Sequence, residues 1–399
     1  MDGDAVEGAN SQVQVAMRDW WRLAAAGLAL GLLTGCGSPE YVAAGPWRPQ
    51  VDGPPPVVGP PPDTDLPPPP APGQPAPPPQ PGAEDPNVIA SGLDTPWGLA
   101  QLPDGSAIVG ERRTGRILQV FPDRSPPLEI MTIPGLDSTG DGGLLGLALS
   151  PAYTEDALVY AYATTATDNR LLRFTLGGTP QAILTGIPKG ATGNGGRIAF
   201  GLDELLYVGT GDTGRPELSA DAASLAGKVL RLDIFGKPAP DNPVSTSPVW
   251  TRGHSNITGL CFDGADRLFV TESLSDEFSL LEPGADYGWR NRPVDADVPT
   301  RVFPDAGLGG CGILNRVAFL GAVDGERILI AILDGNGDTV GEPEEFLAGS
   351  YGRLRTVVVD PIGALWITTS NLDGPGQPAP TDDRVLRVPP PSEAGGGVS

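Results

Sequence analysis

Residues 197–212 read RIAFGLDELLYVGTGD, two short apolar runs on either side of a polar turn at residues 201–204. Alternation with a period of two is typical of β-strands, and a short turn between two such runs predicts an antiparallel hairpin. The pattern occurs five more times along the chain. The other copies are WGLAQLPDGSAIVGE (97–111), LGLALSPAYTEDALVYAYA (145–163), TGLCFDGADRLFVTES (258–273), NRVAFLGAVDGERILIAIL (315–333) and RTVVVDPIGALWITTS (355–370).

The spacing of these hairpins indicates a repeat architecture. Successive copies begin about 40 to 60 residues apart, near the period of propeller blades. A third strand follows four of them, at RILQVF (116–121), RLLRFTL (170–176), KVLRLDI (228–234) and RVLRV (384–388). A blade cannot bury both of its faces alone, so we expect the blades to stack around an axis and close into a ring. The predicted fold class is all-β, a six-bladed β-propeller over residues 87–389, with a strand at residues 88–93 completing the last blade. The alternative is a β-sandwich with irregular loops.

Composition excludes several classes of function. The 399 residues carry a net charge of −23, and a chain this acidic repels phosphate backbones, so we expect no nucleic-acid partner. The single histidine, His254, excludes sites built from two or more histidines, and three cysteines are too few for a four-cysteine metal site. With 56 glycines and 46 prolines the chain is poorly suited to a helical bundle.

The N-terminal region predicts export. Residues 23–33 form an apolar run too short to span a bilayer, preceded by Arg18 and Arg22. The run ends in Leu-Thr-Gly-Cys at residues 33–36, which resembles the bacterial lipobox. We therefore expect residues 1–36 to be a lipoprotein signal peptide, with Met17 as an alternative start of translation, and Cys36 to carry lipid. The alternative is an ordinary cleavage site. The expected location is the extracytoplasmic face of the cell membrane, where the lipid anchor makes the membrane a partner.

The next segment predicts a tether. Residues 37–86 contain 20 of the 46 prolines, and such a composition favours extended polyproline II over a buried core. We expect this segment to be disordered and to hold the propeller away from the membrane. Residues 390–399 are expected to form a flexible tail.

Seven short motifs carry a family resemblance. They are LDTPWG (93–98), GGLLG (142–146), GGR (195–197), GTGD (209–212), GHSN (253–256), DYGW (286–289) and GRLR (352–355). Together they resemble the soluble quinoprotein sugar dehydrogenases, the glucose/sorbosone dehydrogenase family, from about Ser91 to Val388. The resemblance implies a six-bladed propeller that binds pyrroloquinoline quinone (PQQ) and calcium and oxidises aldose sugars.

The resemblance also assigns cofactor residues. PQQ carries three carboxylates, which require cationic donors. Arg353 and Arg355 lie two apart on a predicted strand, so both side chains point to one face, and they resemble the Arg-x-Arg of the family. The alternative is a solvated strand face. Asn256 matches an asparagine of the family that contacts the quinone.

Calcium is the second implied cofactor, and it requires oxygen ligands. Glu277 and, ten residues later, Tyr287 resemble the calcium site of the family, with the Glu side chain and the Tyr carbonyl as ligands. The alternative is an ordinary acidic turn. Residues 334–345 resemble an EF-hand loop, but Thr339 stands where that loop needs glycine, so we expect a polar hairpin there.

Three positions depart from the family pattern. The histidine that would act as base, two residues before the Gly-Gly-Arg core, is replaced by Gly193, which has no side chain to accept a proton. Asp212, which would orient that histidine, is expected to have lost its partner. A glutamine of the family is replaced by Asp141, and an arginine by Ser255. We expect His254 to be a structural residue rather than a substitute base.

The two remaining cysteines, Cys261 and Cys311, are expected to pair. Export places the domain in an oxidising compartment, and a pair leaves no odd thiol once Cys36 carries lipid. Cys261 lies in the first strand of the fourth repeat, and Cys311 is expected just before the first strand of the fifth. The alternative is two separate buried thiols.

These observations predict a lipid-anchored, PQQ-dependent sugar dehydrogenase-like protein whose activity is in doubt, with a sugar as its candidate ligand. One alternative is a non-catalytic binding or scaffold propeller at the cell envelope. A second alternative is a calcium-dependent, lactonase-like hydrolase. That reading requires carboxylates that converge at the propeller axis, and the sequence does not identify such a set.

Overall fold

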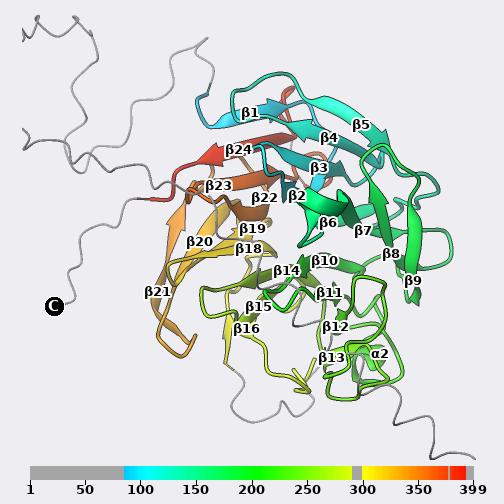
Figure 1. The fold of residues 1–399 in the computed structure, drawn as a ribbon. Coiled ribbons are helices and arrows are strands. Elements are labelled where there is room, and N and C mark those ends of the chain that lie inside the picture. The colour runs from blue at the N-terminus through cyan, green and yellow to red at the C-terminus, as the bar shows by residue number, and fades with distance from the viewer. Residues whose placement is uncertain (1–84, 290–298, 376–377, 392–399) are drawn as a thin grey trace, which may run out of the picture. The chain divides into compact units, whose positions relative to one another are not determined.

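A computed structural model of the chain describes residues 85–289, 299–375 and 378–391. The regular structure in this part of the chain is six four-stranded antiparallel sheets and two one-turn helices, α1 (Tyr153–Asp156) and α2 (Glu217–Ala220). Figure 1 shows the sheets arranged around an axis, with β2, β6, β10, β14, β18 and β22 innermost. The six-bladed all-β propeller predicted from the repeats is therefore confirmed.

The first three blades follow one another directly along the chain. Blade 1 contains β2 (Pro96–Gln101), β3 (Ala107–Glu111), β4 (Arg116–Val120) and β5 (Leu128–Thr132). Blade 2 contains β6 (Leu144–Leu149), β7 (Leu158–Thr164), β8 (Asn169–Thr175) and β9 (Gln181–Ile187). Blade 3 contains β10 (Gly195–Phe200), β11 (Leu206–Thr210), β12 (Lys228–Leu232) and β13 (Val249–Arg252).

The last three blades bring the two ends of the propeller together. Blade 4 contains β14 (Ile257–Phe262), β15 (Leu268–Glu272), β16 (Glu277–Leu280) and β17 (Thr300–Val302). Blade 5 contains β18 (Leu308–Leu314), β19 (Val317–Ala322), β20 (Arg327–Leu333) and β21 (Thr339–Phe346). Blade 6 contains β22 (Leu354–Val359), β23 (Leu365–Thr369), β24 (Arg384–Val388) and β1 (Val88–Ser91).

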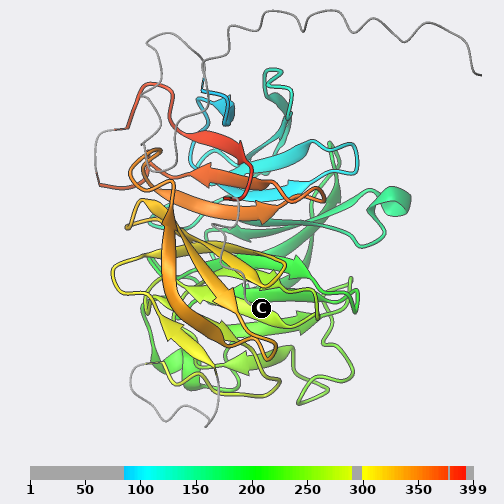
Figure 2. The same ribbon diagram turned by 90° about the vertical axis from the view of Figure 1, so that its left-hand side faces the viewer.

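The ring is closed by the strand that the sequence assigned to the last blade. β1 pairs antiparallel with β24, with Val88 opposite Leu386 and Ser91 opposite Arg384. Figures 1 and 2 show these first and last strands, blue and red, side by side. The closing pair ties the N-terminal part of the propeller to its C-terminal part and leaves no open edge between them.

One repeat is out of phase with the prediction. The segment NRVAFLGAVDGERILIAIL forms β19 and β20, the second and third strands of blade 5, rather than the first and second. The true first strand, β18, contains the glycine-rich run Gly309-Gly310-Cys311-Gly312, whose low hydrophobicity hides it from a search for apolar alternation. Cys311 therefore lies within the innermost strand and not before it.

The turns between first and second strands share a physical device. An aspartate carboxylate accepts hydrogen bonds from backbone amides two and four residues later, as at Asp263 (to Ala265 and Arg267) and Asp360 (to Ile362 and Ala364). Such Asx turns fix the hairpin without any long side chain. Blade 5 is the exception, because its turn between β18 and β19 is Asn315-Arg316 and contains no aspartate.

The innermost strands approach one another at their backbones. A Cβ on Gly98 would collide with the carbonyl oxygen of Leu145, and one on Gly146 with that of Gly196. Glycine is therefore required where blades 1, 2 and 3 meet near the axis. Farther out, apolar side chains of adjacent blades fill the space between sheets, as Leu145 and Tyr160 of blade 2 pack with Ile198 and Val208 of blade 3.

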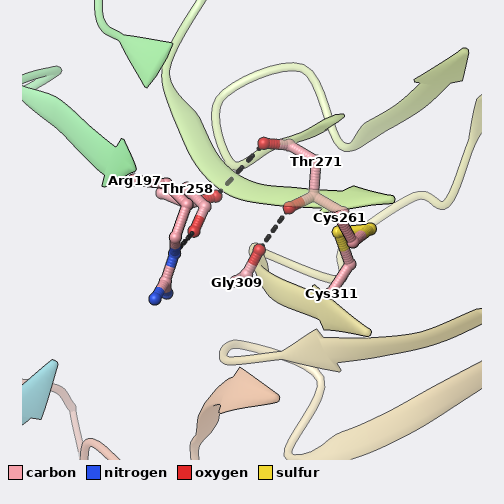
Figure 3. The surroundings of a disulfide bond; sticks show 6 residues. All are labelled: Arg197, Thr258, Cys261, Thr271, Gly309 and Cys311. Atoms are coloured by element: carbon pink, nitrogen blue, oxygen red, sulfur yellow. Dashed lines mark hydrogen bonds between the residues drawn. A yellow bond between two sulfur atoms is a disulfide. The ribbon is translucent and has the colours of Figure 1, made fainter. Parts of the chain in front are cut away.

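A disulfide joins the innermost strands of two neighbouring blades. Cys261 on β14 and Cys311 on β18 are bonded, with their Cα atoms 5.7 Å apart (Figure 3). The pairing predicted from the cysteine count is confirmed. It links blade 4 to blade 5 across a sequence separation of 50 residues.

The predicted signal peptide, Cys36 and the proline-rich tether lie outside the described residues, apart from residues 85 and 86 at the end of the tether. No helix in the described part of the chain is long and apolar enough to cross a membrane. The loop at residues 334–338 is the hairpin between β20 and β21, where the Asp334 carboxylate accepts the amides of Asn336 and Asp338.

Candidate functional site

Polar side chains gather at one end of the propeller, where each innermost strand begins and each second strand ends. These two points meet in an antiparallel hairpin, so every blade presents them on the same face. Hydrogen bonds and ion pairs connect the side chains from one blade to the next. The members of this set, called the polar ring below, are Arg353, Arg355 and Asp373 of blade 6, Arg112 of blade 1, Asp141 of blade 2, Gly193 and Asp212 of blade 3, and Asn256 of blade 4.

The two arginines predicted to clamp a cofactor lie together. Arg353 precedes β22 and Arg355 lies within it, and both contact Ser370 at the end of the paired strand: Nε of Arg353 donates to the Ser370 carbonyl (3.2 Å) and Nε of Arg355 to its hydroxyl (2.7 Å). Arg353 also pairs with the exposed Asp324 at 2.7 Å, and Arg355 with Asp373 at 3.5 Å. Both side chains therefore lie on the same side of blade 6, as their two-residue spacing predicted.

Arg112 and Asp373 extend this cationic side of the polar ring, and the sequence analysis missed both. Nη1 of Arg112 donates to the carbonyls of Gly140 and Gly142, and Nη2 lies 3.4 Å from the Asp373 carboxylate. Burial opposes ionisation of Asp373, but the charge of Arg355 and the bond from Ser370 outweigh it and lower its pKa. Nε of Arg112 is buried and has no hydrogen-bond partner among the described residues, so this guanidinium is incompletely satisfied by them.

Asp141 lies next to Arg112 in the polar ring, because the Arg112 guanidinium binds the carbonyls of the flanking Gly140 and Gly142. Its carboxylate accepts hydrogen bonds from the amide of Gly193 (2.6 Å) and from the side-chain amide of Asn194. Burial is the largest influence on this group and raises the pKa of Asp141 despite those bonds. A carboxyl held toward its neutral form repels an anion less than an exposed aspartate does.

Gly193 faces the carboxylate that was expected to orient a histidine. Gly193 has φ +70°, and a Cβ placed on it would lie 2.8 Å from Oδ1 of Asp212. The position and its predicted partner are therefore adjacent. Asp212 itself is not without partners: the indole Nε1 of Trp289 donates to its Oδ2 at 2.6 Å and the amide of Gly214 to its Oδ1 at 2.8 Å. Asp212 therefore has no histidine beside it at position 193, but its carboxylate is hydrogen-bonded to Trp289 and Gly214.

Asn256 connects blade 4 to blade 3. Its side-chain oxygen accepts the Gly195 amide at 2.7 Å, and its side-chain nitrogen donates to the Ser273 hydroxyl at 2.8 Å. The amide thus holds the start of β10 in place. Ser255 is fully buried and donates to Glu272 at 2.8 Å, so it points away from the polar ring.

His254 is a buried structural residue. Its Nδ1 lies 2.7 Å from Glu272 and its Nε2 2.8 Å from the Thr251 hydroxyl, so both ring nitrogens have partners. Its ring also stacks on Tyr287, with centroids 4.7 Å apart. Nothing in this arrangement leaves a nitrogen free to take a proton from a substrate.

The two residues predicted to bind calcium lie near this histidine. Glu277 begins β16, and burial together with the charge of Glu272 raises its pKa. The Tyr287 hydroxyl donates to the Leu280 carbonyl at 2.8 Å. Within the described residues there is no group of three or more His, Cys, Asp or Glu side chains that could hold a metal.

Comparison with known proteins places this site in a family. Residues 93–297 match the family model described as glucose / sorbosone dehydrogenase. The chain belongs to the glucose/sorbosone dehydrogenase family. The PQQ-bound aldose sugar dehydrogenase from Streptomyces coelicolor is 40% identical, with a TM-score of 0.71 over 76% of this chain and 96% of that one.

Two curated relatives also match. Quinoprotein glucose dehydrogenase B from Acinetobacter calcoaceticus is 30% identical over 250 residues, 52% of each chain. The aldose sugar dehydrogenase of Escherichia coli is 23% identical over 336 residues, 72% of this chain and 90% of that protein. The chain spans about half the length of the curated relatives that share at least 30% identity with it.

The donor set of this family member fits PQQ at its arginines and poorly at Asp141. Three guanidinium groups and the unsatisfied Nε of Arg112 suit an acidic ligand. Asp141, beside Arg112, suits such a ligand only when its carboxyl is protonated. The three arginines are therefore the groups that fit an acidic ligand, and Gly193 adds no side chain beside Asp212.

Proposed function

We propose that this chain is a lipid-anchored, PQQ-binding propeller of the glucose/sorbosone dehydrogenase family with weak or no aldose dehydrogenase activity. The observation that carries the proposal is Gly193, which occupies the place beside Asp212 where a base is needed. A general base contributes about 10²–10⁴ in rate, so its loss removes most of the catalysis while leaving binding intact.

Arg353, Arg355 and Arg112 would hold the carboxylates of the cofactor, and Asn256 would keep the start of β10 in position beside it. When bound, PQQ supplies the two-electron acceptor for oxidation of a sugar hydroxyl. The residues of this chain would bind and orient the cofactor, but Gly193 offers no group beside Asp212 that could take the hydroxyl proton. Asp212 is occupied by Trp289 and Gly214.

A calcium ion is the second proposed cofactor. Glu277 would supply a carboxylate oxygen and Tyr287 its backbone carbonyl, since calcium takes both kinds of ligand. The raised pKa of Glu277 means that part of its affinity for a cation is lost to protonation at acid pH.

The proposed location is the extracytoplasmic face of the cell membrane, reached through lipid on Cys36. The motivating feature is the Leu-Thr-Gly-Cys ending of the apolar run at residues 23–33. Labelling with a fatty acid in a bacterial host should mark the wild type and spare Cys36→Ala, and equal labelling of both would contradict the anchor.

The function is tested by a titration and an assay on the same preparation. Purified protein with calcium is titrated with PQQ by absorbance, and dye reduction is then followed with a panel of aldoses. The S. coelicolor aldose sugar dehydrogenase is assayed in parallel as the reference. We expect quinone binding with a rate about 10²–10⁴ below that of the reference. Turnover equal to the reference would refute the loss of catalysis, and no quinone binding would favour a scaffold propeller.

A further inference from the structure

A second cavity lies on the propeller axis, apart from the polar ring. Its volume is about 300 Å³, at the lower end of the range for small-molecule sites. All six innermost strands contribute to its wall, as the lining residues show: Leu99, Leu147, Ala148, Arg197, Ile198, Ala199, Leu260, Cys261, Phe262, Cys311, Gly312, Ile313 and Val357–Val359. We call this space the axial cavity.

Most of the axial cavity lies farther along the innermost strands than the polar ring, and Arg197, near the beginning of β10, is the lining residue that lies nearer to Arg355 of the ring. The ring is built where the innermost strands begin, whereas the cavity is lined by their later residues, such as 260–262 of β14 and 357–359 of β22. The disulfide between Cys261 and Cys311 forms part of the wall and fixes two of the six strands relative to each other.

One charged side chain lines this otherwise apolar space. Nε of Arg197 donates to the carbonyl of Thr258 and Nη2 to the hydroxyl of Thr356, both at 2.9 Å. The guanidinium lies over the Trp97 ring, 4.3 Å from its centroid. Figure 3 shows the end of this side chain pointing away from β14. Nη1 makes no hydrogen bond to any described residue.

The charge of Arg197 is not neutralised by the described part of the chain. Arg197 is only 7% exposed, and no Asp or Glu there lies within 4.0 Å of it. Burial, with a smaller contribution from the charge of Arg355, lowers the pKa of Arg197 to about 9, so the group remains a cation at neutral pH. A buried cation with only neutral acceptors is unstable relative to one that has an anion beside it.

From this geometry we propose that the axial cavity binds a small monocarboxylate, with its charge at Arg197 and its aliphatic chain against the apolar wall. The guanidinium supplies Nη1 as a charge-assisted donor. The leucine, isoleucine and valine side chains favour a short hydrocarbon chain over a bare inorganic ion, because they gain from covering apolar surface. The single guanidinium therefore selects one negative charge on the ligand, and the apolar lining selects a hydrocarbon chain.

Butyrate is the probe, and isothermal titration calorimetry at constant ionic strength is the measurement. We expect one butyrate per chain, no heat with butyramide, and weaker binding of chloride. Arg197→Gln should reduce butyrate affinity by a factor of about 30 or more, since it removes one partner of a buried charge pair. The matched control is Arg124→Gln, an exposed arginine on the surface, which should bind butyrate as the wild type does.

A second variant keeps the proposal open to refutation if Arg197→Gln does not fold. Ala199→Phe fills the axial cavity and leaves Arg197 in place, and it should also exclude butyrate. A saturating amount of PQQ should not displace butyrate, because the quinone belongs to the polar ring. Butyrate binding that survives Ala199→Phe, that PQQ abolishes, or that is absent from the wild type would each overturn the proposal.

Discussion

The two sides of the polar ring differ in how much of a sugar dehydrogenase they retain. The blade 6 side contains Arg355 paired with Asp373, and Arg353, which pairs with Asp324 of blade 5. The blade 3 side contains Gly193, with no side chain, and Asp212, whose carboxylate is bonded to Trp289. Under the proposed function, cofactor binding therefore depends on the arginines of blades 6 and 1, while position 193 of blade 3 supplies no side chain that could take a proton.

The difference has a physical reason. On the blade 6 side each charge has a partner, so removing one member would leave another buried and unpaired, which costs free energy. On the blade 3 side the carboxylate of Asp212 is satisfied by an indole and a backbone amide that owe nothing to a histidine. The Asp212 carboxylate is therefore satisfied although position 193 has no side chain.

The largest expected effect on PQQ binding comes from removing one of the arginines on the blade 6 side. Arg355→Gln should weaken PQQ binding by a factor of about 30 or more, because a buried charge-assisted contact to a carboxylate is removed and Asp373 loses a counter-charge. The measurement is an absorbance titration with PQQ in the presence of calcium. Arg124→Gln is the matched control, and equal affinities of the two variants would show that the quinone does not use this side.

The next largest effect is expected from removing the negative charge of Asp141. Asp141→Gln should raise PQQ affinity by a factor of about 10, since it removes a carboxylate that faces the cofactor and leaves an amide in its place. The wild type should approach the variant as pH falls, because the raised pKa of Asp141 favours its neutral form there. Glu129→Gln, on the outermost strand β5, serves as a charge-matched control that should change nothing.

The propeller and its closure could be predicted because they are local patterns. Outside blade 5, the hairpins of first and second strands have an apolar alternation and a turn containing aspartate that are visible in the sequence. The strand at Val88–Ser91 completes the last blade, which otherwise has three strands. The first strand of blade 5 could not be found, because its glycines serve close packing at the axis rather than alternation.

The site residues that belong to one sequence motif could be predicted. The residues that meet only through contacts between blades could not. Arg353 and Arg355 stand in one motif, and their shared contact with Ser370 follows from their spacing. Arg112 and Asp373 are more than 250 residues apart in the sequence and meet only because blades 6 and 1 are neighbours. Both residues follow the second strand of their blade, as Asp212 does in blade 3. This shared position was the sequence signal that could have identified them as site residues.

A smaller effect tests whether a base can be restored on the blade 3 side. Gly193→His should yield no robust PQQ-dependent glucose oxidation and should destabilise the fold by about 1 kcal/mol or more. The backbone at φ +70° disfavours any side chain, and a Cβ there lies too close to Asp212. Gly193→Asn should be tolerated better in thermal unfolding, because asparagine adopts this conformation more readily. Recovery of sugar oxidation by the histidine variant would mean that the backbone adjusts and that only the base was missing.

The smallest effect separates the two sides by their pH dependence of stability. The folded-state pKa of Asp141 is raised by burial, so its contribution to stability is present at acid pH and is lost as pH rises through that value. The folded-state pKa of Asp373 is lowered, so its contribution is present at neutral pH and is lost as pH falls. At pH 7 we therefore expect Asp141→Asn to stabilise and Asp373→Asn to destabilise, each by about 1 kcal/mol, a typical size for single substitutions. Urea unfolding of both variants at pH 4 and pH 7 measures this, with the two differences from wild type shrinking at the lower pH. Shifts of the same sign for both variants would show that the two carboxylates do not divide the polar ring as their contacts indicate.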